Sequence, residues 1–160
     1  MLREDGIVMD DGTAARLAED HFVVTTTTAN AVSVYRHMEF ARQVLWPDLD
    51  VQLISITESW AQYAVAGPNA RKLLRKIVDT EFDISNEAFP FMACGVITVF
   101  GGLRARLFRI SFSGELAYEI AVPTRYGEAM MRALIEAAEE FDGCAYGTEA
   151  LGVMLSLIHI

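Results

Sequence analysis

The chain has 160 residues, of which 52% are hydrophobic, and its 13 basic and 22 acidic residues give a formal net charge of −9. A chain of this length can bury roughly 70% of the surface that its unfolded form exposes, which excludes disorder and a disulfide scaffold. The acidic balance argues against a nucleic-acid partner, because such proteins need clustered Lys and Arg to displace counterions. No apolar run reaches the 18 or so residues of a membrane span, so we expect no membrane partner.

Cysteine and histidine are sparse and isolated. Cys94 and Cys144 lie far apart without a CxxC spacing, which favours a reduced, cytoplasmic protein. The three histidines, His21, His37 and His159, have spacings that support neither a metal site nor a catalytic triad.

The first third of the chain predicts a β-meander followed by a helix. Two β-prone runs lie within Gly6–Thr28, with polar turns at Asp10–Gly12 and at Glu19-Asp20. Apolar residues then recur at helical spacing over Ala31–Leu45, and Trp46-Pro47 supplies a stop.

The middle third predicts a hairpin, a tight turn and a second helix. The β-type runs Val51–Thr57 and Trp60–Gly67 are separated by two polar residues and predict an antiparallel hairpin. Pro68 suits the first turn of a helix, and the following run Ala70–Val78 has a single apolar face. Phe82–Pro90 reads as a loop.

The last third predicts two further hairpin connections and a third helix. A Gly101-Gly102 turn joins two β-prone runs, and Ala117–Pro123 forms the next strand. Thr124–Phe141 restarts the helical period with Thr124 as N-cap. Alternating hairpins and single helices predict an α+β fold of antiparallel hairpins with packed helices, not a doubly wound sheet.

The adjacent carboxylates Asp10 and Asp11 are the first candidate site. Neighbouring side chains of an extended segment face opposite sides, so only one of the two could point into a site. The residues alone allow a solvated turn or a carboxylate that orients a basic nitrogen. The hydroxyls of Thr25–Thr28 could likewise contact a ligand or cap the helix that follows.

The second candidate is Glu119, within the sequence FSGELAYE. A Glu between Tyr118 and Ile120 in an apolar strand is costly unless it meets a hydrogen-bond donor. It could be an edge-strand charge in contact with water. Alternatively, it could accept two N–H donors from a flat heterocycle, with Phe112 and the neighbouring Tyr118 packing on the rings.

Four segments carry a family resemblance: GIVMDDGT, VAGPNAR, LFRISFSGELAYEIAVP and YGTEALGVM. They resemble the folate-binding aminomethyltransferase domain, the T-protein family of the glycine cleavage system. The resemblance covers residues 1–154, nearly the whole chain. Phe112 stands where the T-protein segment usually has Tyr, which favours the sarcosine-oxidase branch of the superfamily and leaves no hydroxyl at that position.

The resemblance implies roles for individual residues. Asp10 matches the carboxylate that lies near the reactive folate nitrogens and assists one-carbon transfer, with Asp11 as the alternative if the register differs by one. Glu119 matches the pterin-recognition Glu, and Phe112 would flank the folate. A folate-contacting Arg of the family falls at Leu151 in this chain, so we do not expect that contact.

The resemblance also implies a reaction and partners. We expect a domain that binds tetrahydrofolate and captures the one-carbon unit of sarcosine as 5,10-methylenetetrahydrofolate, alongside other sarcosine oxidase subunits. FAD, FMN and NAD are expected only in the parent complex. The alternatives are a T-protein-type aminomethyltransferase and a non-catalytic scaffold with the same fold.

Both ends of the chain depart from the family pattern. We expect residues 1–154 to be part of a larger folate-binding domain, with Met1 an internal methionine, and the isolated fragment to be inactive. The family pattern does not continue into residues 155–160, so we expect this tail to be non-native.

Overall fold

The computed structural model describes residues 1–155, which form two compact units, Met1–Thr57 and a second unit that begins at Glu58. In the first unit, strands β1 (Ala14–Arg16) and β2 (Phe22–Val24) form an antiparallel hairpin in which Ala15 pairs with Val23. The predicted turn at Glu19-Asp20 lies between them and is confirmed.

The predicted strand before Asp10 is wrong. Only one bridge forms there, between Leu2 and Val8, and both residues are exposed. The segment therefore has neither a second strand to pair with nor an apolar face to bury, which are the two interactions that stabilise a strand.

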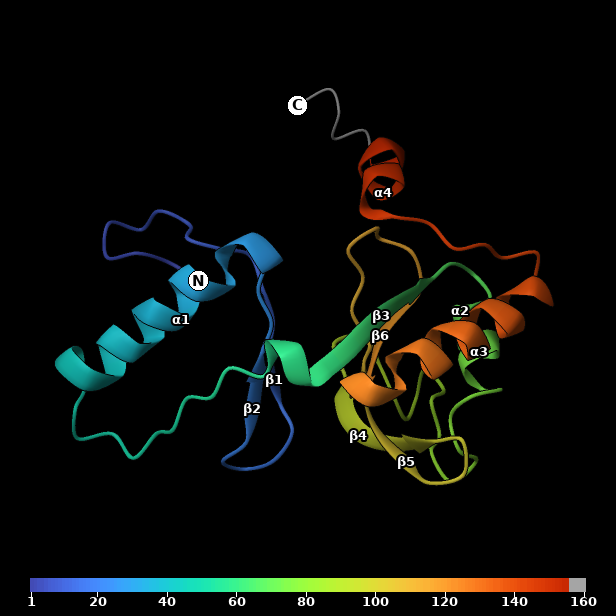
Figure 1. Cartoon of the computed structure of the whole chain (residues 1–160), viewed down its shortest axis with the longest axis horizontal. Coiled ribbons are helices and arrows are strands. Elements are labelled where there is room, and N and C mark those ends of the chain that lie inside the picture. The colour runs from blue at the N-terminus through green and yellow to red at the C-terminus, as the bar shows by residue number, and fades with distance from the viewer. Residues whose placement is uncertain (156–160) are drawn as a thin grey trace. The chain divides into compact units, whose positions relative to one another are not determined.

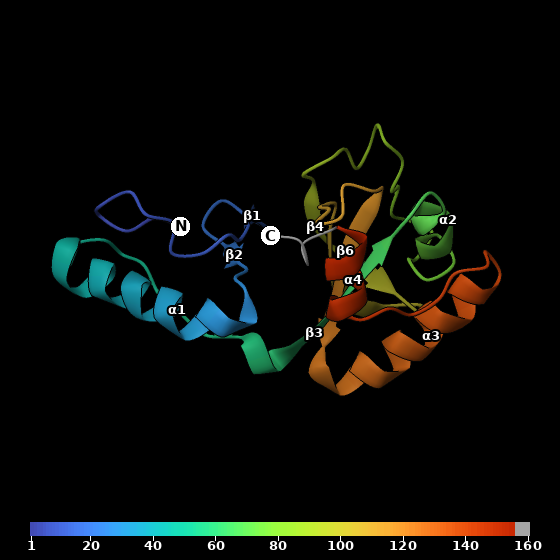
Figure 2. The same ribbon diagram turned by 90° about the horizontal axis from the view of Figure 1, so that it is seen from above.

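The predicted first helix is confirmed. Helix α1 (Ala31–Phe40) follows a 3-10 turn at Thr28–Asn30 and continues as a π-helical turn, Ala41–Leu45, before the backbone leaves helical geometry at Trp46. Figure 2 shows this segment as one continuous rod.

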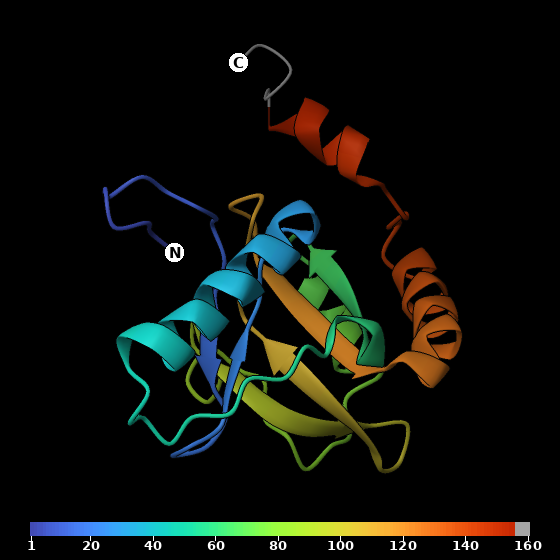
Figure 3. The same cartoon turned by 60° about the vertical axis from the view of Figure 1, so that its left-hand side comes forward.

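The second unit is built on a four-stranded sheet, whose strands lie side by side in Figure 3. The order is β3-β6-β5-β4, and every neighbouring pair is antiparallel. The Gly101-Gly102 turn joins β4 to β5 with φ of 75° and 125°, values that favour glycine, so this predicted hairpin is confirmed. The strand bounds are β3 Trp60–Ala66, β4 Cys94–Val99, β5 Leu103–Phe108 and β6 Ala117–Pro123.

The predicted hairpin between Val51–Thr57 and β3 is wrong. Residues 51–56 have no regular structure, a 3-10 turn follows at Thr57–Ser59, and β3 pairs instead with the distant strand β6. A two-residue hairpin turn needs residues that tolerate positive φ, and Glu58-Ser59 does not supply them.

Two helices cover one face of the sheet, α2 (Ala70–Leu74) and α3 (Gly127–Glu139), and they appear on the same side of it in Figures 1 and 2. The Gly-Pro turn before α2 is confirmed, with Gly67 at φ 121°. Helix α2 is shorter than predicted, because the chain unwinds after Leu74 so that Val78 can bridge to β4. The core between helices and sheet includes Leu74, Val99, Leu107, Tyr118, Ile120, Val122 and Met130.

Two details at the C-terminal end differ from the sequence prediction. Thr124 does not cap α3, because its hydroxyl donates to the carbonyl of Glu58 at 2.6 Å and a 3-10 turn, Thr124–Tyr126, precedes the helix. A further short helix, α4 (Thr148–Met154), was not predicted.

The predicted α+β class with antiparallel hairpins and packed helices is confirmed. Residues 156–160 of the tail expected to be non-native lie outside the described residues, so that expectation stays a prediction. Within residues 1–155, no helix is both long enough and apolar enough to cross a membrane.

Candidate functional site

Asp10 is the centre of a hydrogen-bond network in the first unit. Its side chain is buried, with 4% of its surface exposed. Thr27 donates its backbone N–H to Oδ2 at 2.8 Å and its hydroxyl to Oδ1 at 2.9 Å. The amide of Asn30 also donates to Oδ1, at 3.2 Å. The carboxylate thereby ties the extended segment to the turn that begins the helical region.

These contacts set the ionisation of Asp10. Burial by itself would raise its pKa, but hydrogen bonds from Asn30 and from the hydroxyl and backbone of Thr27 favour the charged form, and the net effect is a lowered pKa. The backbone of Asp11 also donates to this carboxylate, so its acceptor positions, about four in all, are largely used within the first unit. Asp11 is exposed, as expected for neighbours that face opposite sides.

The geometry around Asp10 depends on a close backbone approach at Gly12. A Cβ at this position would overlap the carbonyl oxygen of Thr25. The same two segments are joined by the hydroxyls of Thr13 and Thr25, 2.8 Å apart. Thr25 and Thr27 of the threonine run thus hold the segment that contains Asp10 and Thr13 in place. Sequence reasoning did not connect Thr27 or Asn30 with Asp10.

In the second unit, Glu119 points to the face of the sheet that α2 and α3 do not cover, which we name the helix-free face. On it, β3 contributes Gln62 and β5 contributes Arg106, which lie on either side of Ala121 in the register. Glu119 is half-buried and accepts a hydrogen bond from Nε2 of Gln62 through Oε2. Its second oxygen takes part in no hydrogen bond found within residues 1–155.

Tyr118 lies on the opposite, helix-covered face. Its ring is fully buried, it stacks on Phe89, and its hydroxyl accepts a hydrogen bond of 2.8 Å from Nε of Arg71. Because alternate residues of a strand face opposite sides, Tyr118 and Glu119 do not meet on one surface. The predicted ligand contact of Tyr118 therefore stays a prediction that this packing does not support.

Phe112 lies in the loop between β5 and β6, and 68% of its surface is exposed. The loop turns at Gly114, where φ is 82°. The aromatic ring is thus available for packing against a partner rather than used in the core.

A stack of Trp60 and Arg106 occupies the helix-free face beside Glu119. The guanidinium carbon of Arg106 lies 3.8 Å from the ring centroid of Trp60. The side chain reaches across β6 above Ala121, which is small and buried. In the sequence, the alternation of Arg104 and Arg106 with apolar residues indicates a half-buried strand, but it does not connect either arginine with Trp60.

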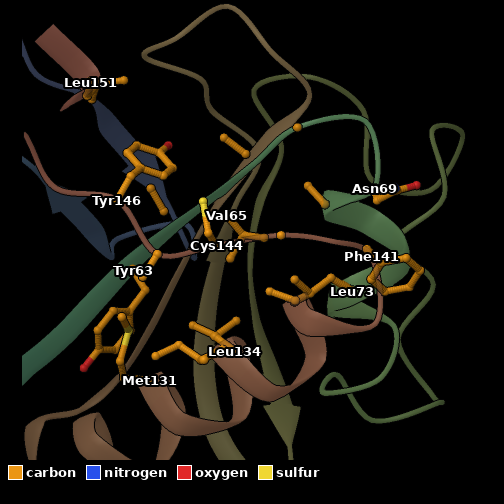
Figure 4. Close-up of a pocket in the computed structure, with 18 of the residues that line it drawn as sticks. Tyr63, Val65, Asn69, Leu73, Met131, Leu134, Phe141, Cys144, Tyr146 and Leu151 are labelled. Carbon is orange, nitrogen blue, oxygen red and sulfur yellow. The ribbon is translucent and has the colours of Figure 1, made fainter. Parts of the chain in front are cut away.

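A cavity of about 630 Å³ lies elsewhere in the second unit, between β3, α3 and the segment that leads to α4 (Figure 4). Leu134, Cys144 and Tyr146 are among the side chains that surround it. Among the described residues that line it, Asp142 alone is charged, and none of the five predicted site residues is among them. Gln62, the hydrogen-bond partner of Glu119, does line the cavity, so the cavity adjoins the β3 side of the Glu119 site.

Comparisons with known proteins agree on one family. The model of the GCVT N-terminal domain matches residues 1–155. Sarcosine oxidase subunit alpha of Rhizobium meliloti strain 1021 is 58% identical over 155 residues, and that of Corynebacterium sp. strain P-1 is 46% identical over 154; each match covers 96% of this chain and 16% of the relative. An aminomethyltransferase of Thermoanaerobacter sp. strain X514 is 26% identical over 141 residues, covering 88% of this chain and 36% of the relative.

A solved structure shares the fold. A chain of the heterotetrameric sarcosine oxidase from Corynebacterium sp. U-96, determined in complex with pyrrole 2-carboxylate, aligns with a TM-score of 0.63 at 18% identity. The alignment covers 86% of this chain and 65% of that one. The chain spans about a sixth of the length of the alpha subunits that it matches.

Proposed function

Because the chain belongs to the family of the GCVT N-terminal domain, we propose that it is a folate-binding, one-carbon-transfer part of a sarcosine oxidase alpha subunit. The observation that carries this proposal is the 58% identity to such a subunit across 96% of the chain. Other sarcosine oxidase subunits are its proposed partners, and FAD, FMN and NAD are proposed only for the parent complex.

Glu119 is the proposed pterin contact. The pyrimidine ring of the reduced pterin is flat and carries adjacent N–H donors on one edge, and the carboxylate of Glu119 can accept from them. Gln62 holds one carboxylate oxygen in place and leaves the other available. Phe112 supplies an exposed ring that can pack against the bound folate.

Asp10 is the proposed catalytic carboxylate, and Asp11 is the alternative. Its lowered pKa keeps Asp10 ionised at neutral pH, so it can accept a hydrogen bond from a protonated nitrogen but cannot deliver a proton of its own. Hydrogen bonds from Thr27, Asn30 and the backbone of Asp11 hold the carboxylate in one orientation, in which it can face an N–H group of the folate. Asp10 thus orients a reacting nitrogen.

Bound tetrahydrofolate supplies amine nitrogens that are nucleophilic without a strong base, and the reaction stores the one-carbon unit as 5,10-methylenetetrahydrofolate. The contribution of the protein is positional. Holding the amine where the one-carbon unit is released replaces a diffusional encounter by a local one, which raises the effective concentration. In the second unit, Glu119 and Phe112 are the residues proposed to hold the heterocycle.

A T-protein-type aminomethyltransferase is the second candidate, because such enzymes match 88% of the chain. Their 26–27% identity is about half that of the sarcosine oxidase subunits, so the oxidase assignment is preferred. The two differ in their amine donor. To distinguish them, the full-length enzyme is given tetrahydrofolate with either sarcosine or the aminomethyl-carrying protein of glycine cleavage. The donor from which it makes 5,10-methylenetetrahydrofolate identifies the candidate.

The folate contact is tested by calorimetric titration of tetrahydrofolate into the full-length protein. Glu119→Gln keeps the shape but removes the charge, and we expect its affinity to fall at least about tenfold, because hydrogen bonds to a charged group are the stronger ones. The matched control is Glu128→Gln, on the exposed surface of α3. Unchanged affinity in Glu119→Gln would remove the assignment of Glu119, and failure of the wild type to bind would remove the proposed function.

A further inference from the structure

Two arginines on the helix-free face have no acidic partner in the described part of the chain. Arg104 and Arg106 belong to β5, and neither takes part in an ion pair found within residues 1–155. The chain has 22 acidic residues against 13 basic ones, so acidic groups are not scarce. Glu119, a diagonal neighbour of Arg106 in the register, accepts its hydrogen bond from Gln62 instead.

Trp60 holds the guanidinium of Arg106 in one orientation. The guanidinium carbon lies over the ring, 3.8 Å from its centroid, a distance at which the flat guanidinium fits best when it packs face to face with the ring. Stacking uses a face of the guanidinium and leaves the N–H groups at its edge, and Arg106 donates no hydrogen bond found within the described residues. A planar fork of N–H donors held in this way matches the two oxygens of a carboxylate.

The surroundings of Arg106 also favour an anion. Partial burial, followed by the positive charge of Arg104, lowers the pKa of the Arg106 guanidinium. An arginine stays protonated in spite of such effects, so Arg106 keeps its positive charge in surroundings that make that charge unfavourable. Arg104 lies two residues along the same strand face, about 6–7 Å away at Cα. An incoming negative charge would be stabilised by both groups.

We propose that Arg106, stacked on Trp60 and assisted by Arg104, binds a carboxylate on the helix-free face. The inference rests on the proposed function, because it places this site beside the proposed pterin contact. Diagonal neighbours on adjacent antiparallel strands lie about 7–8 Å apart at Cα, so Arg106 and Glu119 share one surface within reach of one bound ligand. Two participants in the proposed reaction carry a carboxylate: the folate, in its glutamyl tail, and the amino acid, which is sarcosine before the one-carbon unit leaves and glycine after it.

The test compares three ligands by calorimetry on the full-length protein with its subunits: tetrahydrofolate, tetrahydropteroate, which lacks the glutamyl tail, and glycine. Arg106→Met removes the charge and keeps an apolar stem above Ala121. Arg106→Lys keeps the charge but loses the fork, and serves if the Met variant unfolds. Arg132→Met, an exposed arginine on α3, is the control. Thermal unfolding of each variant reports folding.

If the folate tail is the ligand, Arg106→Met lowers the affinity for tetrahydrofolate at least about tenfold and leaves the affinity for tetrahydropteroate unchanged. The affinity of Arg106→Lys for tetrahydrofolate then lies between those of the wild type and Arg106→Met. If the amino acid is the ligand, glycine affinity falls by a similar factor and neither pterin is affected. Equal losses for both pterins, or no loss for any ligand, overturn the carboxylate site alone. A wild-type protein that binds neither pterin overturns the proposed function, and the carboxylate site with it.

Discussion

The carboxylate of Asp10 accepts both the backbone N–H and the hydroxyl of Thr27, at 2.8 and 2.9 Å, across 17 residues of sequence. This double contact makes Asp10 part of the architecture of the first unit as well as a proposed catalytic group. Loss of activity in an Asp10 variant could therefore reflect loss of a catalytic group or loss of structure in the first unit. The next two predictions measure the structural contribution.

Replacing Thr27 by Val removes the hydroxyl donor and preserves the side-chain shape and the backbone N–H. We expect the free energy of unfolding to fall by about 1 kcal/mol, because one hydrogen bond to a charged acceptor is lost at an exposed residue. Urea denaturation measures the change. Thr28→Val is the matched control, since Thr28 lies outside the Asp10 network, and an equal loss in the control would contradict the prediction.

The lowered pKa of Asp10 gives a defined pH dependence. Since the folded protein favours the ionised form, the stability from Asp10 is fully present above its unfolded pKa, about 3.9 for an ordinary Asp, and is lost as the pH falls through the lower folded value. The difference in unfolding free energy between wild type and Asp10→Asn should be constant above about pH 5 and shrink below about pH 4. Urea denaturation across this range measures it, and a difference that grows on acidification would show the sign to be wrong.

Gly12→Ala places a methyl group against the carbonyl of Thr25, a backbone atom that cannot rotate away. We expect a loss of about 1–3 kcal/mol in stability, the usual range for overpacking. Gly152→Ala is a useful contrast, because its Cβ meets open space within α4 and should raise helix stability slightly. Thermal unfolding of both variants checks this difference in sign.

Leu107→Ala tests the core of the second unit. Leu107 is fully buried between the sheet and its helices, so the deletion leaves a cavity and should cost about 2–5 kcal/mol. Val96→Ala, on the helix-free face of β4 and 36% exposed, should cost clearly less. Equal losses in chemical denaturation would contradict the assignment of the two faces.

Local sequence patterns were sufficient for several elements. The β4–β5 hairpin follows from the glycine pair at its turn, and the Gly67-Pro68 turn and helices α1 and α3 follow from turn chemistry and helical spacing. The family could also be recognised, because its motifs are contiguous in sequence.

The candidate site was only partly predictable. Asp10 and Glu119 were found as residues, but their partners were not, because Thr27 lies 17 residues from Asp10 and Gln62 lies 57 residues from Glu119. The prediction that Tyr118 and Glu119 contact the same ligand neglected that neighbouring side chains of a strand face opposite sides. That alternation could have been read from the sequence.

The sequence by itself thus determined the family, helices α1 and α3, and the hairpin of β4 and β5, since these depend on interactions between near neighbours. Only the tertiary structure decided that β3 pairs with β6, that the surface around Glu119 carries a tryptophan–arginine stack, and that Asp10 is buried in a network of donors. The physical reason is the same in each case. Strand pairing and burial depend on contacts between residues far apart in the chain, and local propensity contains no information about which distant partner is chosen.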